Sequence, residues 1–320
     1  MKGLSSIALL ISVLIFSARL KAQEPLRAAV YYKSSTVTGD QNDFQSACHM
    51  MDVAGLPYDV ISASEDISDY RLVLAAVRPD PSNTTEQDIT RFSAYLSAGG
   101  TLVLPMIRDI RFYEMAGVAE MIQNAKSPVL NWQTNFGYEE LMYFDDPYEI
   151  QTSLGKNADQ TIPAGYYVLA DAVALARYAD GEAGVVRNAV GQGYCYSFGF
   201  RWREVVLRNQ LGYDYSANRS FSNGFEPSAD VFPLFIRALW IKVCPSAVWK
   251  HTSPEGTLSS LMITHDVDSR TGMDTMQYFS TYEKGLGIRT HYFVTTRYFE
   301  DDLGSKYYNP TSIEQILAVM

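Results

Sequence analysis

Histidine and cysteine are scarce in this 320-residue chain, which contains four histidines and three cysteines. Three cysteines are too few for a disulfide scaffold, and an odd number leaves at least one thiol free. Cys195 and Cys244 could pair in an oxidising compartment. The chain also lacks internal repeats and low-complexity tracts. These absences exclude a cystine-rich mini-domain and a repeat architecture.

Positive charge is also in short supply. The chain has 26 Lys and Arg residues against 36 Asp and Glu residues, so its formal net charge is −10. An acidic surface argues against nucleic acid and anionic membrane as partners. The hydrophobic content of 47% and the aromatic content of 13% are those of a globular chain with sizeable cores. The length predicts about two domains.

Residues 1–22 have the pattern of a signal peptide. Lys2 supplies the positive start, residues 7–16 form a short apolar core, and Ala22 offers a small residue at the cleavage position. The apolar core is too short for a comfortable membrane span of about 20 residues, although an uncleaved anchor is the alternative. We therefore expect an exported protein (periplasmic, cell-surface or secreted) with no membrane span after removal of the leader.

Residues 23–245 alternate between strand and helix patterns, which predicts an α/β domain with a mostly parallel sheet and helices on both faces. Glycines at 191 and 193 predict a hairpin turn. Residues 125–165 have weak periodicity and are interpreted as loops and short strands. The expected strands are residues 26–32, 58–61, 72–77 and 101–104, and the expected later helices are residues 201–211 and 229–243.

The order of these elements over residues 26–243 resembles the class I glutamine amidotransferase-like fold, which is flavodoxin-like. The resemblance is carried by residues 54–61, 70–74 and 92–104. Catalytic members of that family hold a cysteine on a tight strand-to-helix turn, and no cysteine of this chain follows a strand in that way. The resemblance thus implies a domain that lacks the catalytic cysteine and serves as a scaffold or a carbohydrate-contacting module.

A second group of motifs follows a predicted linker at residues 246–257. The apolar run from Leu261 ends in Asp266 and Asp268, with His265 beside them. Carboxyl ends of parallel strands are where α/β enzymes place catalytic groups, and carboxylates and imidazoles bind divalent metals. The pattern therefore predicts a metal-dependent site. The alternative is a pair of acids that caps a loop after a buried strand.

Residues 264–268 and 287–294 resemble the first motif and the second strand of the polysaccharide deacetylase family, also called NodB homology or carbohydrate esterase family 4. The resemblance implies that residues 258–320 begin a (β/α) barrel of deacetylase type. It implies Asp266 as the general base and Asp268 as a metal ligand, one residue later than in the family. His265 would support these groups. The implied cofactor is a divalent metal, either zinc, cobalt or nickel, held only in a complete parent domain.

The function that this resemblance implies is an exported, metal-dependent hydrolase that acts on non-peptide carbon–nitrogen bonds and removes acyl groups from glycans. Its substrate would be a polysaccharide or oligosaccharide. A complete barrel takes about 200 residues or more, and no His-x-x-x-His motif occurs, so this chain alone is expected to be inactive, as a fragment or as an inactive remnant. The alternative function is a non-catalytic periplasmic or surface carbohydrate-binding protein.

Overall fold

The computed structural model describes residues 27–34, 37–123, 125–207, 227–246, 261–294 and 310–319. The chain divides into two compact parts, residues 1–250 and 251–320, which we name unit 1 and unit 2. The expected leader and nearly all of the expected linker lie outside the described residues. The predicted domain limits and the exported location therefore stay predictions.

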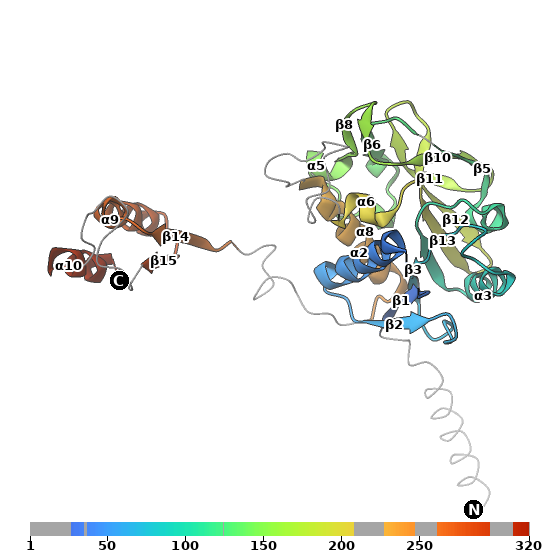
Figure 1. Cartoon of the computed structure of the whole chain (residues 1–320), viewed down its shortest axis with the longest axis horizontal. Helices are drawn as coiled ribbons and strands as arrows, with labels where there is room; N and C mark the ends of the chain where they lie inside the picture. Colours follow the sequence, from blue (N-terminus) through green and yellow to red (C-terminus); the bar gives the residue numbers. More distant parts are fainter. Residues whose placement is uncertain are drawn as a thin grey trace, which may run out of the picture. The chain divides into compact units, whose positions relative to one another are not determined.

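Unit 1 is built around one mixed sheet of 11 strands (Figure 1). One half of this sheet is parallel, as the sequence predicts, because its inner strands are short apolar runs that helices cover on both faces. In spatial order the parallel strands are β2 (Tyr58–Ser62), β1 (Ala28–Tyr32), β3 (Leu72–Ala76), β4 (Thr101–Leu104) and β13 (Gly193–Phe198).

The other half of the sheet is antiparallel, so the expectation of a mostly parallel sheet is wrong. Strands β12 and β13 form the predicted hairpin, which turns at Gly191 with φ 59°. The region that was expected to be loops and short strands supplies paired strands that extend the sheet. The antiparallel strands are β12 (Ala183–Val190), β11 (Val173–Tyr178), β6 (Val129–Trp132), β7 (Gln151–Ser153), β10 (Gly165–Leu169) and β5 (Val118–Gln123), while β8 (Gly155–Asn157) and β9 (Gln160–Thr161) pair separately.

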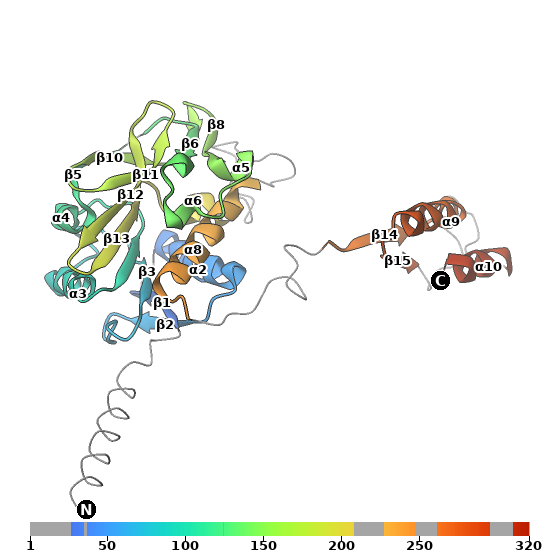
Figure 2. The same cartoon turned by 180° about the vertical axis from the view of Figure 1, so that it is seen from behind.

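Helices cover both faces of the parallel half (Figures 1 and 2). Alternation along β1 divides the core, because Ala28 and Val30 face one cluster while Ala29 and Tyr31 face the other. The first cluster includes α2 (Thr38–Ala54), α6 (Trp202–Val205) and α8 (Val231–Val243), and the second includes α3 (Glu86–Ser97) and α4 (Tyr113–Ala116). The remaining short helices are η1 (Ile110–Phe112), η2 (Thr134–Phe136), η3 (Glu139–Leu141), α5 (Pro147–Ile150) and η4 (Pro227–Asp230).

Two further local details bear on the core. The capping box of α3 is formed by Thr85 and Asp88, and the hydroxyl of the neighbouring Thr84 donates a hydrogen bond to the Asp109 carboxylate at 2.7 Å. Cys195 and Cys244 are both buried free thiols that belong to opposite core clusters, so they do not form a disulfide.

Unit 2 is a small βαβ arrangement. Strand β14 (Ile263–Val267) pairs in parallel with β15 (Thr290–Val294), and α9 (Arg270–Gly285) connects them. Helix α10 (Pro310–Val319) packs against α9. Within the described residues, β14 and β15 pair only with each other. The chain is therefore of mixed α/β class, as expected, but neither a deacetylase-type barrel nor an amidotransferase domain is shown.

Candidate functional site

The carboxyl edge of the parallel strands in unit 1 gathers charged side chains. Strands β1, β3 and β13 end there, and the segments that follow them carry Lys33, Arg78 and Arg201. Ligands of open α/β sheets bind at this edge, where loops between strands and helices can diverge without disturbing the core. It is therefore the candidate site of unit 1.

Arg201 forms the most buried ion cluster of this edge. Its guanidinium donates to the Asp40 carboxylate at 2.8 Å and to the Gly39 carbonyl at 3.0 Å, and it also pairs with Asp43. The backbone N–H of Arg203 donates to Asp43 at 3.1 Å. Burial raises the pKa of Asp43, while the charge of Arg201 opposes that rise. The cluster joins α2 to the segment after β13.

Asp88 forms a second cluster at the start of α3. Its carboxylate accepts hydrogen bonds from the Tyr31 hydroxyl at 2.7 Å and from the Lys33 ammonium at 2.9 Å, in addition to those from Thr85. Burial alone would raise the pKa of Asp88, but these hydrogen bonds outweigh burial and lower it to about 2. A carboxylate with so low a pKa is a weak base at neutral pH. The second cluster thus suits a structural role better than proton transfer.

A third buried carboxylate, Glu140, lies in η3 against the antiparallel half. One of its oxygens, Oε1, accepts hydrogen bonds from Arg187 (2.7 Å), Tyr196 (2.6 Å) and Lys242 (2.6 Å). Burial raises the pKa of Glu140, but the three hydrogen bonds outweigh burial and lower the pKa to about 2. The sequence did not reveal this residue, because Glu139 and Glu140 read as ordinary surface acids. We call Glu140 and its three donors, Arg187, Tyr196 and Lys242, the Glu140 cluster.

In unit 2, the predicted residues lie at the end of β14 as expected. Asp266 is the fourth of five strand residues and is exposed, and Asp268, directly after the strand, is exposed as well. Within the described parts of the chain, no three His, Cys, Asp or Glu residues come close enough together to hold a metal ion. The roles of Asp266 as a base and Asp268 as a ligand, and the expected divalent metal, stay untested predictions.

His265 is placed quite differently from these two acids. Its ring stacks on Tyr292, with 4.7 Å between the ring centroids, and its Nε2 lies 2.6 Å from the Glu283 carboxylate. Thr290 and Tyr292 donate to the other oxygen of Glu283 at 2.8 and 2.9 Å. His265 therefore joins β14 to α9. Glu283 could have been found from the sequence, since it lies seven residues after Met276 on the same helical face.

We predict that Glu283 stabilises unit 2 only when it is ionised. Burial raises its pKa, but hydrogen bonds from Thr290, His265 and Tyr292 outweigh burial and lower the pKa below its ordinary value of 4.5. The stabilisation is then complete above pH 4.5 and is lost as the pH falls through the lower pKa of the folded state. Glu283→Gln should speed amide hydrogen exchange in β14 at neutral pH and have little effect in strong acid. Comparing both proteins at each pH cancels the intrinsic exchange rates, and a difference that is equal at every pH would contradict the prediction.

Unit 1 matches a known protein family. The model of the beta-galactosidase trimerisation domain family matches residues 42–212, which is more than half of the chain. The chain belongs to this trimerisation-domain family. No curated protein sequence matches it significantly. The match includes β2, β3, β4 and β13 and therefore the core of the parallel half.

Several solved structures resemble this chain at low sequence identity. The beta-galactosidase from Bacillus circulans sp. alkalophilus has a TM-score of 0.46 and 17% identity, over 70% of this chain and 32% of that protein. The GH42 beta-galactosidase Gan42B, described from G. stearothermophilus, has a TM-score of 0.40 and 18% identity, over 60% and 30%. A ThuA-like protein from Bacteroides uniformis ATCC 8492 has a TM-score of 0.46 and 10% identity, over 71% and 96%. The chain spans about a third of the length of the beta-galactosidases that it matches.

These findings correct the family expected from the sequence. The resemblance to polysaccharide deacetylases and to amidotransferases is wrong, because the matching family model is that of the beta-galactosidase trimerisation domain. The expected metal-dependent deacetylase function is wrong for the same reason, and the non-catalytic carbohydrate-binding alternative is no better supported. The motifs misled because a strand that ends in acids followed by a helix and a second strand is common to many α/β proteins.

The sequence predicts no membrane span after removal of the leader. No helix among the described residues is both long enough and apolar enough to cross a membrane.

Proposed function

We propose that unit 1 is the self-association domain of a glycoside hydrolase of beta-galactosidase type and that it assembles as a trimer. The observation that carries this proposal is the family match over residues 42–212. The reaction that the assembly serves is, in this proposal, hydrolysis of a β-galactoside, so the substrate is a carbohydrate. The role of unit 1 itself is to hold three copies together.

The surface beside the Glu140 cluster has the composition of an association surface. Phe136 is 62% exposed and stacks on Tyr138, with 5.8 Å between the ring centroids. The guanidinium of Arg187 lies over the Tyr138 ring at 5.2 Å, and Met142 nearby along the chain is 49% exposed. Aromatic residues, Met and Arg are enriched where protein surfaces associate. We name Phe136, Tyr138 and Met142 the Phe136 patch.

A charge placed on the Phe136 patch should dissociate the trimer. A buried aromatic anchor of an interface contributes about 2 kcal/mol or more, so Phe136→Glu should weaken association at least about 30-fold. Sedimentation velocity at several protein concentrations measures this effect directly on the 320-residue chain. We expect the wild type to sediment as a trimer and Phe136→Glu to sediment as a monomer over the same range.

Ile110→Glu is the matched control for this experiment. Ile110 is 73% exposed in η1 and is not part of the Phe136 patch. The same substitution there should leave the trimer intact. A wild-type chain that stays monomeric at all concentrations would refute the proposed function, whereas a trimer that only Ile110→Glu dissociates would move the interface to η1.

A further inference from the structure

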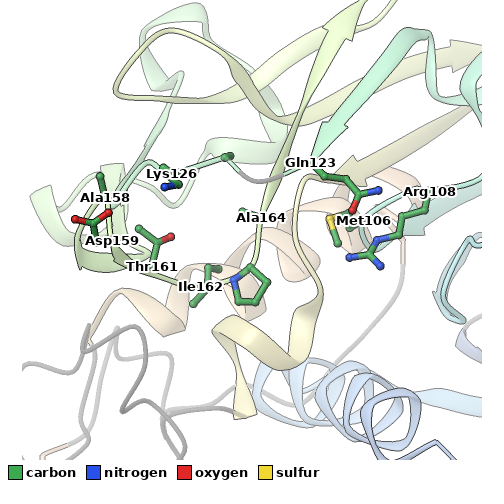
Figure 3. A pocket seen from close by; sticks show the side chains of 11 residues that line it. Met106, Arg108, Gln123, Lys126, Ala158, Asp159, Thr161, Ile162 and Ala164 are labelled. Atoms are coloured by element: carbon green, nitrogen blue, oxygen red, sulfur yellow. The ribbon is translucent and has the colours of Figure 1, made fainter.

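A cavity of about 310 Å³ opens where β4 ends in unit 1 (Figure 3). Its volume lies at the small end of the range of ligand sites, about 300–1,000 Å³. Met106, Ile162 and Pro163 supply apolar surface, while Arg108, Gln123, Lys126, Asp159 and Thr161 supply polar groups. It belongs to the same carboxyl edge as the Arg201 cluster, but none of the ion pairs described above lines it.

The backbone that carries these side chains is held by hydrogen bonds. The N–H of Met106 donates to Phe200 at 3.1 Å, and the N–H of Arg108 donates to Pro79 at 2.7 Å. Elsewhere in the lining, the N–H of Ile162 donates to the carbonyl of Leu154 at 2.9 Å. The walls are therefore fixed while the polar side chains are available, which lowers the entropic cost of binding a ligand.

The side chains of Arg108 and Lys126, the two cations of the cavity, make no hydrogen bond or ion pair with any described residue. By contrast, Lys33, Arg111 and Arg201 of unit 1 pair with carboxylates. Arg108 does act on Asp80, but hydrogen bonds from Ser82 lower the pKa of Asp80 more than the charge of Arg108 does. The lining thus carries two positive charges and one negative charge in a chain whose net charge is −10.

The polar groups divide between the two ends of the cavity. Figure 3 shows Arg108 and Gln123 together at one end, and Lys126, Asp159 and Thr161 at the other. A guanidinium beside an amide can bind a carboxylate through two or more N–H donors. An ammonium, a carboxylate and a hydroxyl together offer both donors and acceptors, which suits hydroxyl groups because each hydroxyl donates and accepts.

From this arrangement we propose that the cavity binds a small monocarboxylate that carries several hydroxyl groups. Its carboxylate lies against Arg108 and Gln123, its hydroxyls face Lys126, Asp159 and Thr161, and its carbon chain covers Ile162. This site is independent of trimer formation, since the Phe136 patch supplies none of the lining residues.

Isothermal titration of the 320-residue chain with D-gluconate tests the proposal. Sorbitol is the matched neutral probe, because it replaces the carboxylate by a hydroxymethyl group. We expect saturable binding of gluconate and binding of sorbitol at least about tenfold weaker, since the charge-assisted hydrogen bonds are lost. Arg108→Gln should also weaken gluconate binding at least about tenfold. Because Arg108 is exposed and its side chain makes no hydrogen bond or ion pair with a described residue, this variant should fold normally.

Lys126→Gln and Lys156→Gln separate a specific site from general charge attraction. Both remove one positive charge from an exposed lysine, but only Lys126 lines the cavity. Only Lys126→Gln should weaken binding, and Phe136→Glu should bind gluconate like the wild type whether or not the trimer forms. Absence of saturable gluconate binding below about 10 mM, equal binding of sorbitol, or equal losses in both lysine variants would each overturn the proposal.

Discussion

Glu140→Ala is expected to lower the free energy of unfolding of unit 1 by about 3–5 kcal/mol. The side chain of Glu140 is fully buried, and its removal leaves Arg187 and Lys242 facing each other with side chains that are only 20% and 17% exposed. Breaking a buried ion pair by removing one partner costs more than the pair contributes, because the remaining charge is not solvated. The Glu140 cluster also joins η3, β12, β13 and α8. The loss of stability should therefore extend over the first core cluster, to which α8 belongs.

Urea unfolding followed by tryptophan fluorescence measures this loss. All four tryptophans lie within residues 1–250, so their emission reports on unit 1 alone. Glu139→Ala is the matched control, because the Glu139 side chain is 68% exposed and lies 3.6 Å from Lys242. An exposed pair of this kind contributes about 1 kcal/mol or less. Equal losses in the two variants would contradict the burial argument.

The effect of Glu140 should also depend on pH. Its pKa is about 2 in the folded protein and 4.5 ordinarily, so its ionised form contributes stability fully above pH 4.5. That contribution is lost as the pH falls from 4.5 toward 2, and it amounts to about 3 kcal/mol. The difference in stability between the wild type and Glu140→Ala should therefore shrink in this pH window. A difference that stays constant down to pH 2 would show that packing, and not charge, explains the loss.

Arg201→Ala is expected to have the second largest effect, also about 3–5 kcal/mol of unfolding free energy. Asp43 and Asp40 are 1% and 4% exposed, and both accept hydrogen bonds from Arg201. Without the guanidinium, Asp43 must carry an uncompensated buried charge or bind a proton. Loss of the positive charge raises the folded pKa of Asp43 further above the ordinary value of 3.8. A group with a raised folded pKa stabilises the folded state as the pH falls, so the deficit of the variant should become smaller in acid.

Two further variants distinguish charge compensation from packing at this site. Arg177→Ala removes an arginine whose side chain donates one exposed hydrogen bond, to Gly181 at 2.7 Å, and it should cost about 1 kcal/mol or less. Adding Asp43→Asn to Arg201→Ala should recover part of the lost stability, because it removes the unpaired charge. If the double variant is less stable than Arg201→Ala, the buried charge is not the cause of the loss.

The elements of the parallel half were predictable from the sequence, because the determinants of each are local. An apolar run such as Leu72–Ala76 has one favourable conformation once both of its faces are covered, and Gly191 permits the positive φ of the hairpin turn. The same holds for β14 and for the position of Asp266 and Asp268 at its end. Residue types over a few positions also set the mixed α/β class.

The pairing of charges could not be predicted, because each pair joins residues that are distant in the sequence. Arg201 and Asp43 are 158 residues apart, and Lys242 and Glu140 are 102 residues apart. Periodicity describes which face of an element is apolar, but not which charged residue of another element lies opposite. Only the packing of η3 against α8 and the sheet decides that Glu140 is buried while Glu139 is exposed.

The sequence by itself determined the strands of the parallel half, the β12–β13 hairpin and the acidic character of the chain, since these depend on neighbouring residues and on composition. The tertiary structure decided the antiparallel half of the sheet, the buried ion clusters around Arg201, Asp88 and Glu140, and the cavity beside Arg108. Those features arise when segments far apart in the chain meet, and their free energy depends on the exclusion of water, which no local pattern of residues records.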